Sequence, residues 1–101
     1  MTIAVNINGT LATIVLSGGI DYSTQEDFRN ANKQALSAEG VTEIHVDFIK
    51  ANFLDSAGIR ALLVLQKDAE AAGTDVFLLN CNEYMLEIFE IGGFDKVFKF
   101  Q

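Results

Sequence analysis

The sequence contains no tryptophan and no proline, and it has one histidine and one cysteine, His45 and Cys81. A single cysteine cannot form an intramolecular disulfide, which fits a reducing compartment such as the cytoplasm. One histidine and one cysteine cannot build a His/Cys zinc site, and they leave little for histidine-based catalysis. The composition therefore predicts a cytoplasmic protein that binds a partner, uses no metal or cofactor, and is not an enzyme.

Positive charge is also scarce. The chain has 7 Lys and Arg residues against 14 Asp and Glu, which gives a formal net charge of −7 at pH 7. A surface this acidic argues against nucleic acid or an anionic membrane as the main partner. No apolar run approaches the ~20 residues that cross a bilayer, and the first residues lack the basic start of a signal peptide. We therefore expect no direct membrane insertion.

What is present is the composition of a globular protein. Half of the residues are hydrophobic and 21% are charged. A length of 101 residues fits one domain, and no repeat or low-complexity linker divides it. We therefore expect a single domain over residues 1–101.

The N-terminal part of the chain predicts a β-hairpin. Apolar residues alternate over residues 3–7, which is the period of a half-buried strand. Asn8 and Gly9 follow, and both tolerate the positive φ angles of a type I′ turn. Residues 10–17, rich in Leu, Ile and Val, supply the second strand, and Gly18–Gly19 interrupts the pattern.

Beyond the hairpin, helical and strand patterns alternate. Ser23 and Glu26 have the spacing of a capping box, which predicts a helix to about Ser37, with a left-handed Gly40 just beyond it. Further helices are expected from Asp55–Gly58 to Gly73 and from Asn82 to Gly92–Gly93, and strands over residues 43–48, 75–79 and 96–100, the last as a short strand or extended tail. The order β-β-α-β-α-β-α-β favours an α/β fold, a mixed sheet with an N-terminal hairpin, covered by helices.

The segment Asp55-Ser56-Ala57-Gly58 carries the most chemical information. Asp55 or Ser56 occupies the N-cap position of the helix that follows, and small residues keep bulk low there. A helix start offers unpaired N–H groups and a partial positive charge, so a phosphate on Ser56 would find favourable electrostatics. Asp and Ser are also ordinary helix caps, so the residues alone leave both interpretations open.

Four stretches in order along the chain resemble the STAS family, which includes the bacterial anti-sigma factor antagonists. They are a Gly-x-hydrophobic-Asp pattern, a hydrophobic-Asp-hydrophobic strand, the Asp-Ser-small-Gly-aliphatic signature and a closing helix with a final strand, within residues 16–21, 45–48, 53–59 and 88–98. Together they span residues ~3–100 and match the STAS-like order of strands and helices derived above. The resemblance implies an anti-sigma factor antagonist.

The resemblance also implies a mechanism. The unphosphorylated antagonist binds an anti-sigma factor serine kinase and so releases the sigma factor. The kinase phosphorylates the signature serine, Ser56 here, and a serine phosphatase reverses the modification. Ala57 stands where some members have a second serine, which removes a competing acceptor. Phosphorylation is expected to block binding electrostatically while the fold stays unchanged.

Residues around Ser56 are the candidate partner contacts. We expect them to be Asp21, Phe53, Leu54, Asp55, Ala57, Gly58 and Arg60. Several have structural alternatives: Asp21 also suits a turn or helix cap, Arg60 a solvated helix face, and the Phe53–Leu54 pair either the core or an exposed docking rim. The sequence predicts structural roles for His45 on the opposite sheet face, for Asp47 as a partner of a backbone or neighbouring group, and for Cys81.

The sequence leaves one other function open and argues against a second. STAS subunits of lipid-transport ABC complexes also carry Asp-Ser-Ala-Gly signatures, and they would not depend on phosphate cycling. A two-component receiver needs an acidic pair after its first strand, which this sequence lacks.

Overall fold

A computed structural model describes residues 2–101. The elements follow the predicted order, with a single 3-10 turn added before the last strand. They are β1 (Thr2–Asn8), β2 (Leu11–Ile20), α1 (Gln25–Ser37), β3 (Glu43–Leu54), α2 (Ser56–Ala72), β4 (Asp75–Leu79), α3 (Glu83–Ile91), the 3-10 turn (Phe94–Lys96) and β5 (Lys99–Phe100).

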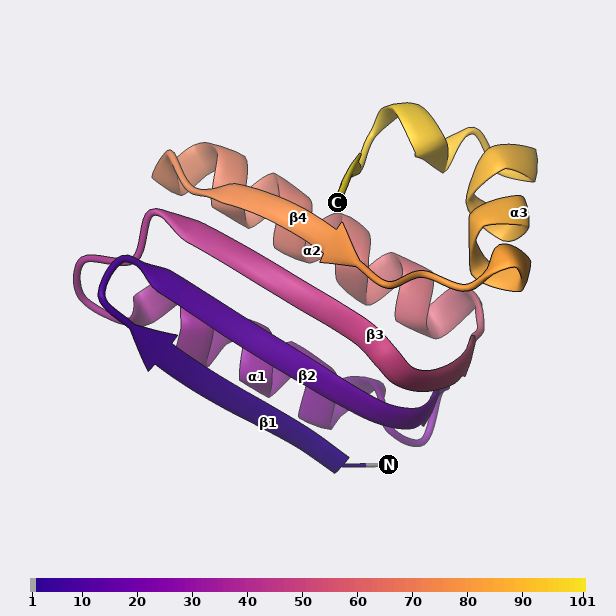
Figure 1. The fold of residues 1–101 in the computed structure, drawn as a ribbon, viewed down its shortest axis with the longest axis horizontal. Coiled ribbons are helices and arrows are strands. Elements are labelled where there is room, and N and C mark those ends of the chain that lie inside the picture. Colours follow the sequence, from indigo (N-terminus) through magenta and orange to yellow (C-terminus); the bar gives the residue numbers. More distant parts are fainter. Residues whose placement is uncertain (1) are drawn as a thin grey trace.

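The five strands form one mixed sheet in the order β1-β2-β3-β4-β5. β1 and β2 are antiparallel, and every later neighbour pair is parallel. Because right-handed crossovers advance in one direction from β2 to β3 to β4, both connecting helices fall on the same face. Figure 1 shows α1 and α2 behind the sheet and α3 beyond the carboxyl end of β4. The predicted α/β fold is confirmed, with α1 and α2 covering one face.

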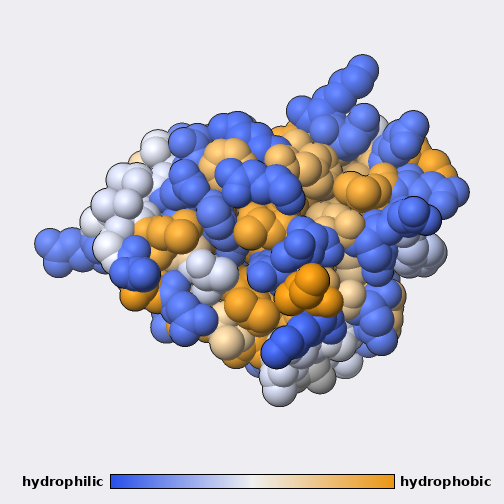
Figure 2. Space-filling view, viewed as in Figure 1, coloured by the Kyte–Doolittle hydropathy of each residue, from blue (hydrophilic) through white to orange (hydrophobic). Residues whose placement is uncertain are grey.

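The core lies between the sheet and these two helices. Alternate side chains of β2 and β3 point toward the helices and are almost completely buried. α1 contributes Phe28, Ala31 and Ala35, and α2 contributes Ala61, Leu62, Leu65 and Ala69. The other face, which Figure 2 shows, mixes polar and apolar side chains without a covering helix among residues 2–101.

Three helix ends match the sequence prediction. Asn82 caps α3, its side-chain oxygen accepting from the Met85 N–H at 2.8 Å. Gly73 ends α2 in the left-handed region with φ +73°, and Gly93 follows α3 with φ +76°. Glycine has no Cβ to oppose a positive φ, so these positions stop a helix at low cost.

The predicted start of α1 is wrong. Ser23 and Glu26 form no capping box, because the N-cap is Thr24, whose side chain makes no capping bond. The Ser23 hydroxyl instead donates to the carboxylate of Asp21. A charged acceptor competes better for this donor than a neutral one. Gly40 has the expected positive φ, but it lies in the turn to β3, since the C-cap of α1 is Ala38.

The predicted hairpin turn is displaced by one residue. Asn8 is the last residue of β1 and pairs with Leu11, so the two-residue loop is Gly9–Thr10. Within that loop only Gly9 has a positive φ, which is the pattern of a type II′ turn and not of the predicted type I′ turn.

Both central strands are longer than predicted. β2 continues through Gly18–Gly19 to Ile20, and β3 continues from Phe48 to Leu54, where the sequence predicts a loop. The register between them shifts twice along this stretch. Each shift moves the alternation of buried and exposed residues by one position, so the period-2 pattern is lost while strand pairing continues.

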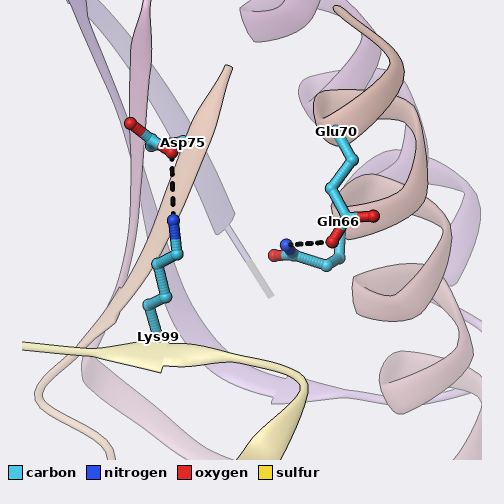
Figure 3. Close-up of polar contacts among 4 residues, drawn as sticks. All are labelled: Gln66, Glu70, Asp75 and Lys99. Atoms are coloured by element: carbon cyan, nitrogen blue, oxygen red, sulfur yellow. Dashed lines mark hydrogen bonds and ion pairs between the residues drawn. The ribbon is translucent and has the colours of Figure 1, made fainter. Parts of the chain in front are cut away.

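The C-terminal segment attaches along β4. The predicted strand over residues 96–100 is the end of a 3-10 turn followed by the two-residue β5. Figure 3 shows Lys99 of β5 reaching Asp75 of β4, with 3.0 Å between Nζ and the carboxylate, and Gln66 bonded to Glu70 along α2. Within residues 2–101, no helix is both long and apolar enough to cross a membrane.

Candidate functional site

Two neighbouring strand ends position the candidate site. Gly19 pairs with Phe53 and Ile20 with Leu54, so β2 and β3 finish side by side. The backbone N–H of Asp55 donates to the Ile20 carbonyl at 3.0 Å, just beyond the ladder. The turn after β2 and the start of α2 therefore lie next to each other.

Asp55 is the N-cap of α2. Its carboxylate accepts the N–H groups of Ala57 at 2.9 Å and of Gly58 at 3.1 Å. Ser56 is consequently the first residue of the helix and is exposed. No residue in the described chain hydrogen-bonds to the Ser56 hydroxyl, which stays open to a modifying enzyme or a partner.

Asp21 organises the adjoining turn. Its carboxylate accepts from the Ser23 hydroxyl at 2.6 Å, from the Ser23 N–H at 2.9 Å and from the Thr24 N–H at 3.2 Å. The hydrogen bond from the Ser23 side chain holds the pKa of Asp21 below its usual value of 3.8, against a smaller effect of desolvation. The carboxylate is therefore ionised at neutral pH and places negative charge beside the start of α2.

Leu54 and Gly58 do not match their expected role as partner contacts, because both are buried. A Cβ added at Gly58 would lie 2.3 Å from Cδ1 of Leu54 and 2.9 Å from Cγ2 of Ile20. Glycine at this position lets the first turn of α2 pack against the ends of β2 and β3. These residues pack the first turn of α2, which carries Ser56, against the sheet.

Phe53 points the other way and is 40% exposed. Its ring lies over Gly19, where an added Cβ would meet Cε1 at 2.0 Å. Of the pair that the sequence leaves undecided, Leu54 belongs to the core and Phe53 to the exposed rim. Gly19 is a supporting residue that no predicted site includes, although a glycine pair at the end of a strand signals a close approach.

Two further side chains of these elements are exposed. Arg60 is exposed one helical turn after Ser56, so the two share a face of α2. Tyr22, directly after Asp21, is 79% exposed. No motif in the sequence singles out Tyr22, although an aromatic residue in a polar turn is a signal of its own.

The residues predicted to be structural have structural contacts. The Asp47 carboxylate accepts from the Ile49 N–H at 2.9 Å and from the side chain of Asn80 at 2.9 Å. His45 lies on the face opposite the core and meets the Phe77 ring edge-on at 5.7 Å. Burial raises the pKa of the Cys81 thiol to about 11, which disfavours the reactive thiolate.

Comparisons with known proteins agree on one family. The family model described as STAS domain matches residues 2–101. A STAS-domain containing protein of Pseudomonas aeruginosa (strain UCBPP-PA14) is 30% identical over 92 residues, which cover 91% of this chain and 89% of that protein.

Solved structures share the fold. The unphosphorylated anti-sigma factor antagonist SpoIIAA superposes with a TM-score of 0.77 at 24% identity, covering 99% of this chain and 87% of that one. The phosphorylated form of the Bacillus protein gives a TM-score of 0.76 at 24% identity, covering 99% and 91%. An anti-sigma factor antagonist from Mycobacterium paratuberculosis gives 0.85 at 18% identity, covering 98% and 83%.

Proposed function

This chain belongs to the STAS domain family, and we propose that it is a cytoplasmic anti-sigma factor antagonist without catalytic activity of its own. In its unphosphorylated form it binds an anti-sigma factor serine kinase, which then releases the sigma factor. The kinase transfers phosphate to Ser56, and a serine phosphatase removes it. The exposed, unbonded hydroxyl of Ser56 at the start of α2 is the observation that carries this proposal.

The surroundings of Ser56 suit a residue that is modified without unfolding. Asp55 already satisfies two N–H groups of the first turn, so the serine is not needed as the cap. The partial positive charge of the helix start tolerates a phosphate, and Arg60 is one turn away on the same face. Phe53 supplies exposed apolar area beside it for a protein partner.

The same surroundings explain how a phosphate would block binding. It adds up to two negative charges next to Asp21 and Asp55, on a chain whose net charge is −7. Docking would then desolvate the phosphate and bring it against groups that fit a neutral hydroxyl. A loss of about 2–4 kcal/mol weakens binding roughly 30- to 1,000-fold. SpoIIAA adopts this fold in both forms, which supports a local block.

The test is phosphate transfer from a co-encoded serine kinase and ATP, followed by intact mass measurement. We expect one added phosphate on the unaltered chain and none on Ser56→Ala. Ser37→Ala is the matched control, since Ser37 is also an exposed helical serine and should leave transfer unchanged. Calorimetry should then show that Ser56→Asp binds the kinase at least tenfold more weakly than the unaltered chain.

Two outcomes would contradict the proposal. One is Ser56→Asp binding the kinase as tightly as the unaltered chain. The other is an absence of phosphate transfer together with co-purification of ABC permease and ATPase components, which would support the lipid-transport assembly role instead.

A further inference from the structure

β1 forms one edge of the sheet, and within residues 2–101 no strand pairs with its outer side (Figure 1). Its seven residues include no charged side chain and no proline, and its pairing with β2 is regular from end to end. Natural proteins usually protect a free edge with lysine, proline or a bulge, because unpaired N–H and C=O groups invite another strand. The opposite edge, β5, has two residues and carries Lys99.

We propose that β1 pairs antiparallel with β1 of a second copy of this chain, joining two five-stranded sheets into one continuous sheet. Antiparallel pairing of identical strands obeys a two-fold axis, so the contact closes on itself and forms a dimer. This surface is separate from the residues around Ser56, and the inference does not depend on the proposed function.

The residue pattern of β1 is self-complementary in one register. With the two-fold axis at Val5, this residue faces its own copy and Ile3 faces Ile7 of the second copy. All three lie on the helix-side face, because alternate residues of a strand share a face. Ile3 and Val5 are half-buried in the single chain, whereas Ile7 is 44% exposed. Pairing of the two β1 strands therefore covers Ile7, the apolar side chain that is exposed to solvent in the single chain.

A groove on the helix side of β1 fits the same arrangement. Its volume is about 410 Å³, and it is lined by Ile3, Val5, Asp27, Asn30, Ala31 and Gln34. α1 and β1 run in the same direction, since both are antiparallel to β2. The two-fold axis consequently brings Asp27 toward Gln34 of the second copy and Asn30 toward its own copy. The side-chain amide of Gln34 then faces the carboxylate of Asp27 in the second copy. Among the residues that line the groove, no two of like charge face each other.

Long-range charge works against this association. Each copy carries a net charge of −7, so two copies repel one another before their edges meet. Salt screens that repulsion while leaving backbone hydrogen bonds and apolar burial in place. The dimer is accordingly expected to strengthen as salt concentration rises, which is the opposite of an association held by ion pairs.

A charge-swap pair on the exposed face of β1 tests both the contact and its register. Ala4 and Asn6 are exposed and would face each other across the two-fold axis. The double variant Ala4→Lys/Asn6→Lys then creates two like-charged cross-strand pairs, and Ala4→Glu/Asn6→Lys creates two opposite-charged pairs. In sedimentation velocity, we expect a reversible dimer for the unaltered chain, about tenfold weaker association for the Lys/Lys variant, and restored association for the Glu/Lys variant.

A control variant distinguishes the effect of charges placed on β1 from the effect of adding positive charge elsewhere on the chain. Tyr84→Lys/Ile91→Lys adds the same two positive charges on α3, at side chains that are 57% and 78% exposed. It should dimerise at least as tightly as the unaltered chain, since the added positive charges lower the net negative charge that opposes association. Any one of four results would overturn the proposal. The unaltered chain could stay monomeric up to about millimolar concentration, or the Lys/Lys variant could still dimerise. The Glu/Lys variant could stay dissociated, or the α3 variant could lose the dimer.

Discussion

At the scale of single residues, Asp21 and Asp55 perform the same local task. Each carboxylate accepts the backbone N–H groups of residues two and three positions ahead, immediately after a parallel strand. Aspartate is favoured for such turns because its short side chain reaches these donors. The acidic surroundings of Ser56 therefore arise from the chemistry that ends two strands and starts two helices.

Gly58 is predicted to be intolerant of even one methyl group. In Gly58→Ala the new Cβ would lie 2.3 Å from Cδ1 of Leu54, so the strand end or α2 must shift. We expect a loss of about 1–3 kcal/mol in the free energy of unfolding, measured by urea denaturation. Ala57→Ser, at the neighbouring half-buried position, should change stability by less than about 1 kcal/mol. Equal effects of the two substitutions would contradict this interpretation of the packing.

The Asp21 carboxylate is predicted to make the free energy of unfolding depend on pH. Because its pKa is lower in the folded chain than the usual 3.8, ionised Asp21 stabilises the fold above that pH, and the contribution is lost as pH falls through the folded pKa. The stability difference between the unaltered chain and Asp21→Ala should be largest near neutral pH and shrink below about pH 3.8. Urea denaturation at several pH values measures it. A difference that stays constant down to about pH 2 would rule out the carboxylate as the cause.

At the scale of elements, the sequence predicts which helices and strands form, and in what order, better than it predicts where each one begins and ends. Caps at Asn82 and Gly73 define helix ends because each acts through its own backbone neighbours. The lengths of β2 and β3 depend on register shifts between two strands, and the sequence of either strand alone does not encode them. For the same reason the sequence does not decide which of Phe53 and Leu54 faces the core.

The first register shift between β2 and β3 is predicted to depend on the Asp47 carboxylate. Asp47 accepts the N–H of Ile49 next to the first register shift and also links β3 to Asn80 after β4. Asp47→Ala should cost about 1–2 kcal/mol in the free energy of unfolding, because both donors lose their partner. Asp47→Asn keeps an acceptor oxygen and should recover much of that loss. If Asn proves as damaging as Ala, the charge and not the acceptor would be responsible.

At the scale of the whole molecule, the crossovers decide where the site is. Parallel β2 and β3 finish at the same edge, so residues far apart in the chain, Asp21 and Ser56, come together there. The order of elements and the signature motif predict this convergence from sequence. Packing at Gly19 against Phe53 requires the three-dimensional pairing of the two strand ends, which no local pattern specifies.

The half-buried Cys81 has a practical consequence. Raising the pKa of its thiol from 9.0 to about 11 lowers the thiolate fraction near neutral pH roughly a hundredfold. A cysteine introduced at an exposed site, such as Ile49 on β3, would then react with a maleimide dye far faster than the natural thiol. The unaltered chain is already a suitable background for placing one fluorophore and following partner exchange in real time.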